Sequence, residues 1–212
     1  MFVQNMCGVV YGEFGYREKG QEHLEKALEI DPSNPQVNYN LARFLPSRRN
    51  IDRALEHYKR ANEEFTGNAR VLHGLGMALV GSGDLEESLG KYDEALEAGG
   101  EFGELYFARG DTLNLLERYE EAQKELSKAL EYFENHEQWL RLAKSNLIMA
   151  IAKFNSGDLK GSVRSAEEGL SLIKRIEDSD LKINPVTDDP RTKVSSIKSE
   201  LIIISSRAVL EQ

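Results

Sequence analysis

A period of 34 residues runs through most of this 212-residue chain. Small residues recur at this step in three series: Ala27, Ala61, Ala95 and Ala129; Gly8, Ala42, Gly76 and Gly110; Gly20, Ala54, Ser88 and Ala122. Large residues recur at the same step in two series: Tyr11, Leu45, Leu79 and Leu113; Leu24, Tyr58, Tyr92 and Leu126. A repeat of this length limits the chain to a fold in which one small unit is stacked on copies of itself, because such a unit cannot bury its apolar face alone.

Each unit reads as two amphipathic helices. Leu24, Ala27 and Leu28 follow helical spacing, and the small residues of the two helices face each other so that the backbones can approach closely. Turn-forming residues stand between the helices at 81–84 and between units at 31–35. The sequence therefore predicts an all-α fold, a right-handed α-solenoid of helix-turn-helix hairpins.

This 34-residue pattern of Gly or Ala, a large residue, Ala, and an aromatic or Leu resembles the tetratricopeptide repeat (TPR). The resemblance implies four regular repeats at about 2–34, 35–68, 69–102 and 103–136. The family proline is present as Pro32 only. The conspicuous family Trp is replaced by Gln4, Asn38, Leu72 and Tyr106.

The regularity changes after Ala129, where the next equivalent residues lie 40 positions further on. We expect a fifth hairpin at 137–176, with six extra residues that lengthen its first helix at the start, so that the five repeats span 1–176. A polar linker at 177–191 and a helix at 192–212 follow. That helix either closes the apolar end of the solenoid as a C-terminal capping helix or detaches to bind a partner's groove.

The N-terminal edge has no comparable cap, so Phe2, Val3 and Met6 are expected to be exposed there. Either the chain is a piece of a longer protein or this edge contacts something. Self-association through the uncapped N-terminal end is one hypothesis.

Composition excludes several classes of function. The net charge of −9 argues against nucleic acid as the ligand, and no apolar run is long enough for a membrane span. A single cysteine, Cys7, and the lack of a signal-peptide pattern at the N-terminus favour the cytoplasm.

No set of residues predicts an active site, a metal site or a cofactor, so we expect a protein that is not an enzyme. The glycine-rich stretch 76–82 lacks the lysine of a phosphate-binding loop. His23 and His57 occupy the same repeat position and are expected to be solvated, too far apart to share a metal ion.

In the TPR family the first helix of each hairpin lines a concave groove that binds a peptide or helix. The resemblance assigns the groove positions to Asn5, Met6, Val9, Tyr39, Asn40, Arg43, Arg70, His73, Met77, Phe107, Asp111 and Ile151. The family clamp for acidic chaperone tails falls at Asn5, Val9, Asn40, Arg70 and Gly74, of which Asn40 alone matches in type. We therefore expect no chaperone-tail capture.

The leading hypothesis is a protein-protein interaction scaffold or assembly factor that binds an amphipathic helix or apolar peptide of another protein. Met and aromatic groove residues suit an adaptable apolar contact, although some of them could simply pack against neighbouring helices. The alternatives are a self-assembling structural block and a regulatory module of an enzyme complex.

Overall fold

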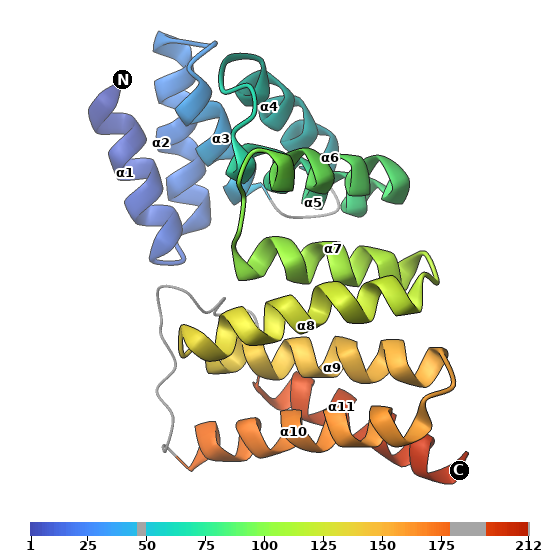
Figure 1. The fold of residues 1–212 in the computed structure, drawn as a ribbon. Coiled ribbons are helices and arrows are strands. Elements are labelled where there is room, and N and C mark those ends of the chain that lie inside the picture. Colours follow the sequence, from blue (N-terminus) through green and yellow to red (C-terminus); the bar gives the residue numbers. More distant parts are fainter. Residues whose placement is uncertain (46–49, 179–193, 212) are drawn as a thin grey trace. The chain divides into compact units, whose positions relative to one another are not determined.

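The computed structural model describes residues 1–45, 50–178 and 194–211, and the described residues form eleven α-helices (Figure 1). The chain divides into two compact units, Met1–Gly100 and Glu101–Gln212. Each unit is a stretch of α-solenoid built from consecutive helical hairpins. The linker expected at 177–191 lies outside the described residues, apart from Glu177 and Asp178.

The described residues of unit 1 form three hairpins. Their helices are α1 (Phe2–Glu13), α2 (Arg17–Ile30), α3 (Pro35–Phe44), α4 (Ile51–Glu64), α5 (Ala69–Ser82) and α6 (Leu85–Glu97). Asparagines start two of the first helices, because the side chain of Asn34 accepts a hydrogen bond from the amide of Val37 and Asn68 accepts bonds from Arg70 and Val71.

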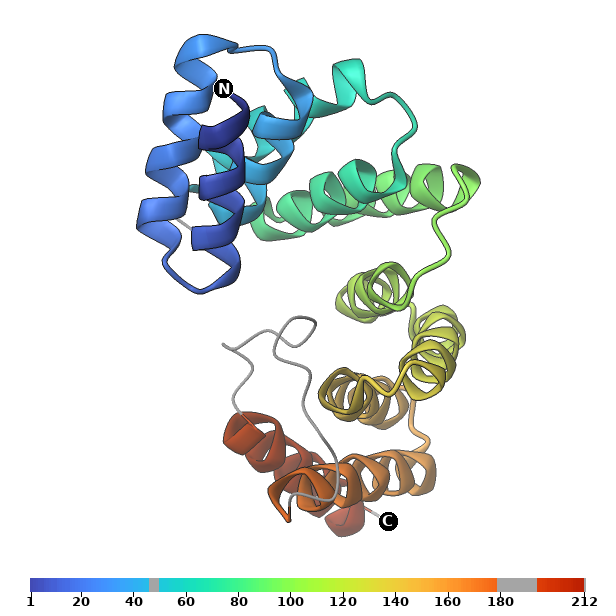
Figure 2. The same cartoon turned by 90° about the vertical axis from the view of Figure 1, so that its left-hand side faces the viewer.

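The described residues of unit 2 form two hairpins and a last helix. Its helices are α7 (Gly103–Leu115), α8 (Tyr119–Asn135), α9 (Trp139–Asn155), α10 (Leu159–Glu177) and α11 (Val194–Leu210). In Figure 2 α7 and α8 are seen nearly end-on. The helix α11 packs against both α9 and α10.

The small residues of the repeat lie where two helices of one hairpin touch. A Cβ atom added to Gly8 would lie 2.9 Å from the carbonyl oxygen of Gly20, and one added to Gly20 would lie 2.8 Å from that of Gly8. A Cβ at Gly110 would lie 2.8 Å from Cγ of Leu126. These distances are shorter than van der Waals contact, so the short side chains permit the close approach.

The large residues at the same step fill the space beside these contacts. Leu24, Tyr58, Tyr92 and Leu126 are buried, as are the four alanines from Ala27 to Ala129. The two series therefore form the core that the 34-residue period predicts.

In the hairpins whose turns are fully described, the turn contains one residue with a left-handed backbone. Gly15, Gly83 and Gly157 stand there with φ of 84°, 95° and 87°, and Glu117 stands at the same repeat position with φ of 61°. A residue with a Cβ atom is strained in this region, whereas glycine is not.

The extra six residues of the fifth hairpin are shared between two helices. Compared with α6 and α7, α8 is longer by four residues at its end, α9 is longer by four residues at its start, and the loop between them is two residues shorter. The expected lengthening of the first helix at its start accounts for only part of the insertion. Phe133, near the end of α8, is buried against Leu142 of α9, so the added turns pack on each other.

Candidate functional site: the first-helix surfaces

The predicted groove residues fall in two sets, nine on α1, α3 and α5 of unit 1 and three on α7 and α9 of unit 2. Met6 and Met77 are about half exposed, and Arg43 and Arg70 are also exposed. Asn5, Val9, Tyr39, His73, Phe107, Asp111 and Ile151 are half-buried. Asn40 is the one buried member of the set.

Polar side chains connect α1 to α3 in unit 1. The amide nitrogen of Asn40 donates to Oδ1 of Asn5 at 2.9 Å, and Oδ1 of Asn40 accepts from Gln36 at 3.2 Å. Nearer the other end of the same helices, Arg43 forms an ion pair with Glu13 at 2.7 Å. The amide of Asn40 is therefore already engaged within the chain, and a ligand could use it only by displacing Asn5 or Gln36.

Arg43 also covers aromatic rings of its own helix. Its guanidinium carbon lies 5.7 Å from the ring centre of Tyr39 and 5.4 Å from that of Phe44. Tyr39 in turn contacts the ring of Tyr58 edge-on at 6.1 Å. This arrangement holds Tyr39 and Arg43 at the surface as a cation-aromatic pair.

One place of the family clamp is closed by packing. A Cβ atom on Gly74 would lie 2.6 Å from Cζ of Tyr58, so the ring of Tyr58 fills the space that a longer side chain would need. The clamp is therefore interrupted at Gly74 for a steric reason as well as by residue type.

In unit 2 the surface of the first helices α7 and α9 carries more charged side chains than the first-helix surface of unit 1. Glu104 of α7 forms an ion pair with Arg141 of α9. The ammonium group of Lys144 lies 5.0 Å from the ring centre of Phe107. Burial raises the pKa of Asp111 above its ordinary value, and the nearby charge of Lys144 partly opposes this shift.

Sequence reasoning did not select Arg141 or Lys144. The 40-residue step after Ala129 relates Lys144 to Glu104, so the altered repeat contained the signal for one of them. Arg141 has no equivalent in the regular repeats, because it belongs to the four added residues at the start of α9.

The expectation for His57 was wrong. His57 is buried, and its Nδ1 lies 2.8 Å from Oδ1 of Asn38. Burial lowers the pKa of His57, because it disfavours the charged imidazolium. The equivalent pair in the first hairpin, His23 and Gln4, is 2.6 Å apart and only half-buried.

These two pairs stand where the first two repeats lack the family tryptophan. Gln4 and Asn38 stand at the Trp position of the family, and each contacts a histidine of the second helix in the same hairpin. In both hairpins a polar contact therefore joins the two helices at this position.

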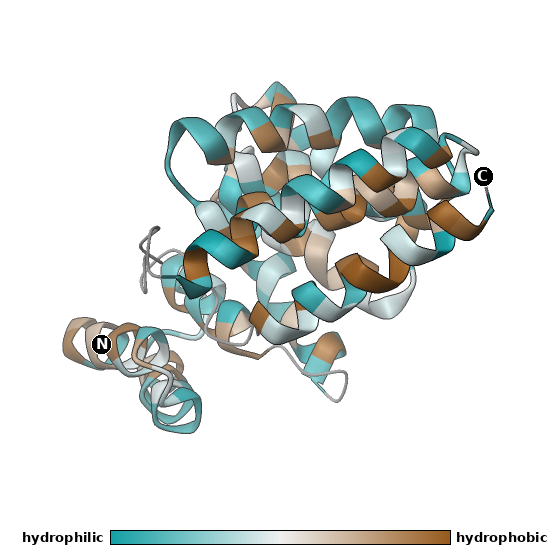
Figure 3. Ribbon diagram, turned by 90° about the horizontal axis from the view of Figure 1, so that it is seen from below, coloured by the Kyte–Doolittle hydropathy of each residue, from teal (hydrophilic) through white to brown (hydrophobic). Residues whose placement is uncertain are grey.

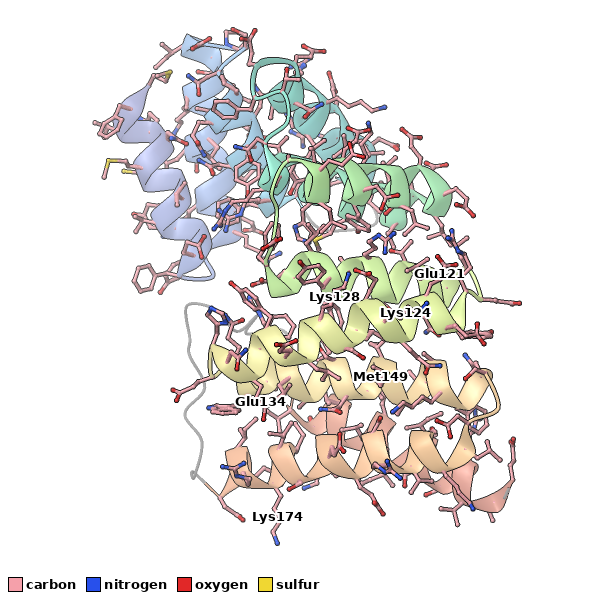
Figure 4. All side chains as sticks on the ribbon, viewed as in Figure 1. Glu121, Lys124, Lys128, Glu134, Met149 and Lys174 are labelled. Atoms are coloured by element: carbon pink, nitrogen blue, oxygen red, sulfur yellow. The ribbon has the colours of Figure 1, made fainter. Side chains whose placement is uncertain are left out.

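The second helices carry many charged side chains on their outer sides. Figure 4 labels Glu121, Lys124 and Lys128 along α8. Glu121 pairs with Arg118 at 2.8 Å, and Lys128 pairs with the buried Glu125 at 2.9 Å. Such pairs at helical spacing favour helix formation and solubility, and they leave the first helices as the less charged surfaces.

Among residues 1–45, 50–178 and 194–211, no group of three or more His, Cys, Asp or Glu side chains is arranged to hold a metal ion. Within the same residues no helix has both the length and the apolar character needed to cross a membrane.

Family models described as tetratricopeptide repeat match residues 3–34, 23–56 and 73–137. The chain belongs to the tetratricopeptide repeat family. As a TPR protein it has the fold of a protein-protein interaction scaffold.

A curated relative of this TPR chain is the type IV pilus assembly protein PilF of Pseudomonas aeruginosa. It is 32% identical over 144 residues, which cover 68% of this chain and 54% of PilF. The chain therefore spans about half the length of the curated relative it matches.

Solved structures of similar fold have lower identity. MamA is 15% identical with a TM-score of 0.66, covering 87% of this chain and 97% of MamA. The TPR protein TTC0263 of Thermus thermophilus is 19% identical with a TM-score of 0.66, covering 98% of this chain and 97% of TTC0263. YrrB, described as a TPR protein with an unusual peptide-binding site, is 20% identical with a TM-score of 0.58, covering 89% of this chain and 96% of YrrB. At these identities the likeness concerns the fold.

Proposed function

We propose that this TPR protein is a non-catalytic scaffold or assembly factor that holds a helix or peptide of a partner protein on its first helices. The observation that carries the proposal is that eleven of the twelve predicted groove positions are exposed or half-buried. Tyr39 and Arg43, and likewise His73 and Met77, stand four residues apart on first helices and are exposed or half-buried. Side chains at this spacing form a continuous surface along a helix.

The chemistry of these surfaces suits an amphipathic ligand. In unit 1 the thioether of Met77 and the ring of Tyr39 offer adaptable apolar contacts beside the guanidinium of Arg43. In unit 2 the ring of Phe107 lies beside the ammonium group of Lys144. A ligand with apolar anchors and flanking carboxylates complements both sets, since each set presents an exposed cation next to an aromatic ring. In unit 1 such a carboxylate would compete with Glu13 for Arg43.

The match to a type IV pilus assembly protein supports a role in assembling a larger complex. If the assembled structure is a pilus, cells that lack this protein should carry fewer surface pili, and plasmid-borne protein should restore them. Unchanged piliation in the deletion strain would exclude this form of the proposal. The cytoplasmic location inferred from the sequence stays a prediction.

The surface itself is tested by matched substitutions in unit 1. Met77 on the first helix α5 and Ile30 on the second helix α2 are both exposed apolar residues, at 55% and 63%. A partner is first identified by co-purification with the tagged full chain and then titrated as a purified protein. We expect Met77→Glu to weaken binding about tenfold or more, a loss of about 1.4 kcal/mol, and Ile30→Glu to change it less than about twofold.

Phe107→Ala tests the surface of unit 2 in the same titration. Circular dichroism of each variant checks that the helices remain folded. If Met77→Glu and Phe107→Ala both bind with the affinity of the unchanged chain, the first-helix surfaces do not hold this partner.

A further inference from the structure

The helix α11 is apolar on two opposite sides, and among residues 1–45, 50–178 and 194–211 only one of these sides is covered. Its inner side packs on α9 and α10 through Ile197, Leu201, Ile204 and Ala208. Its outer side carries Ile202, Ile203, Val209 and Leu210, which are 48%, 55%, 57% and 85% exposed. A helix that only closes a repeat array should be polar on its outer side. Figure 3 shows hydrophobic segments on the helix that runs to the C-terminus.

No charged side chain interrupts this outer side. At 100° per residue, Ser199 and Ser206 stand between the exposed apolar residues, and both serines are exposed. Lys198 stands at one flank, where it pairs with Glu177 at 2.6 Å. A second apolar helix can therefore cover the outer side without burying a charge, which would be costly.

The central residues of the outer side read the same in both directions, whereas Val209 and Leu210 lie outside this symmetric set. Ser199, Ile202, Ile203 and Ser206 are symmetric about the point between Ile202 and Ile203. In an antiparallel pair of α11 helices, Ser199 faces Ser206 of the second copy and Ile202 faces Ile203 of the second copy. The short serines let the two helix axes approach while the isoleucines fill the centre of the contact.

The charges at the other flank distinguish antiparallel from parallel pairing. Glu200 and Arg207 are seven residues apart and so stand on the same flank, about 20° from each other. Two-fold antiparallel pairing brings Glu200 of one copy within about 3 Å, along the helix axis, of the level of Arg207 in the other copy, and does so twice. Two-fold parallel pairing would instead turn this flank toward the opposite flank of the second copy, where Lys198 stands, so Glu200 and Arg207 would not meet.

We propose that α11 is a self-association surface on which two copies of this chain form an antiparallel, two-fold symmetric dimer. Such isologous dimers are the commonest oligomers of soluble proteins. The contact lies on the side of α11 that faces away from α9 and α10. The residues of the proposed first-helix surfaces lie on α1, α3, α5, α7 and α9, and none of them lies on α11.

The full chain is tested by sedimentation velocity and by light scattering between about 1 and about 100 µM. The expected result is a dimer that dissociates on dilution. Ile203→Glu should give a monomer over the whole range. The matched control is Val10→Glu on α1, where Val10 is 51% exposed, and this variant should dimerise normally.

A charge exchange tests the antiparallel geometry. Glu200→Arg and Arg207→Glu should each raise the dissociation constant about threefold to tenfold, because each places like charges together across the contact. The double variant should return to the value of the unchanged chain. This measurement remains decisive even if Ile203→Glu fails to fold.

Three results would overturn the proposal. The first is that the unchanged chain is still a monomer at about 100 µM. The second is that Val10→Glu removes a dimer that Ile203→Glu leaves intact, which would assign the contact to α1. The third is that the dissociation constant of the double charge variant does not return to that of the unchanged chain. A monomeric chain whose α11 variants lose a purified heterologous partner would assign the outer side to that partner instead.

Discussion

Replacing Leu201 by Ala tests whether α11 is an integral part of unit 2 or a detachable helix. Leu201 is fully buried, and a Cβ atom on Gly169 of α10 would lie 2.9 Å from either of its Cδ atoms. The change removes three buried carbon groups, which costs about 2.4 kcal/mol at about 0.8 kcal/mol each. The cavity left behind raises the expected loss to about 3–4 kcal/mol.

The assay is urea unfolding of the full chain followed by the fluorescence of Trp139. This is the single tryptophan of the chain, and it packs against the core of unit 2. With a slope of about 2 kcal/mol per M, the midpoint should fall by about 1.5–2 M. The matched control is Leu115→Ala in the same unit, because Leu115 is 54% exposed and its truncation should cost less than about 1 kcal/mol.

Equal and small shifts for Leu201→Ala and Leu115→Ala would refute the reasoning. They would mean that α11 leaves α9 and α10 at little cost in free energy. The helix would then be available as a detachable binding element, the alternative that the sequence left open.

Three further predictions concern single residues. The pKa of His57 is lowered in the folded state, so its neutral form is favoured there. The free energy of unfolding should therefore be fully retained above the unfolded pKa of about 6.5 and fall as the pH drops below it. In thermal melts, His57→Gln should flatten this dependence on pH. Because the pKa of Asp111 is raised by burial, its ionised form is disfavoured, so Asp111→Asn should raise the melting temperature at pH 7 and reduce this gain towards pH 4. Glu117→Gly should stabilise unit 2 by about 1 kcal/mol by relieving the positive φ at the turn, and an unchanged urea midpoint would contradict this.

The architecture was predictable because two helices that touch closely require small residues at the contact, and residue size can be read from the sequence. The contact between Gly8 and Gly20 can be recognised from the sequence, since both glycines belong to series of small residues that recur every 34 residues. Glu117 shows the complementary case: its backbone angle follows from its place in the turn and is invisible in its residue type.

The fifth hairpin shows where periodicity stops being informative. A step of 40 residues gives the size of an insertion and leaves its position open between two helices. The structure divides the insertion between α8 and α9, where Phe133 and Leu142 pack on each other. Burying both added turns gains more apolar contact than lengthening one helix into solvent.

The candidate site was predictable in outline and less so in its contacts. The common helix side of Met77, Arg43 and the half-buried Asp111 follows from their shared repeat position. The engagement of Asn40 by Asn5 does not, because it depends on the distance between two successive first helices. His57 was misjudged for a similar reason: its burial is stabilised by Asn38, which stands 19 residues earlier on the neighbouring helix.

The helix α11 combines two roles that substitutions at neighbouring positions can separate. Leu201 points to the inner side and Ile203 to the outer side, so Leu201→Ala should lower the free energy of unfolding while folded molecules still associate. Ile203→Glu should abolish association while leaving the urea midpoint, measured at submicromolar concentration, almost unchanged. If both substitutions instead moved both quantities together, folding and self-association would use the same side of α11, and the assignment of its two sides would be wrong.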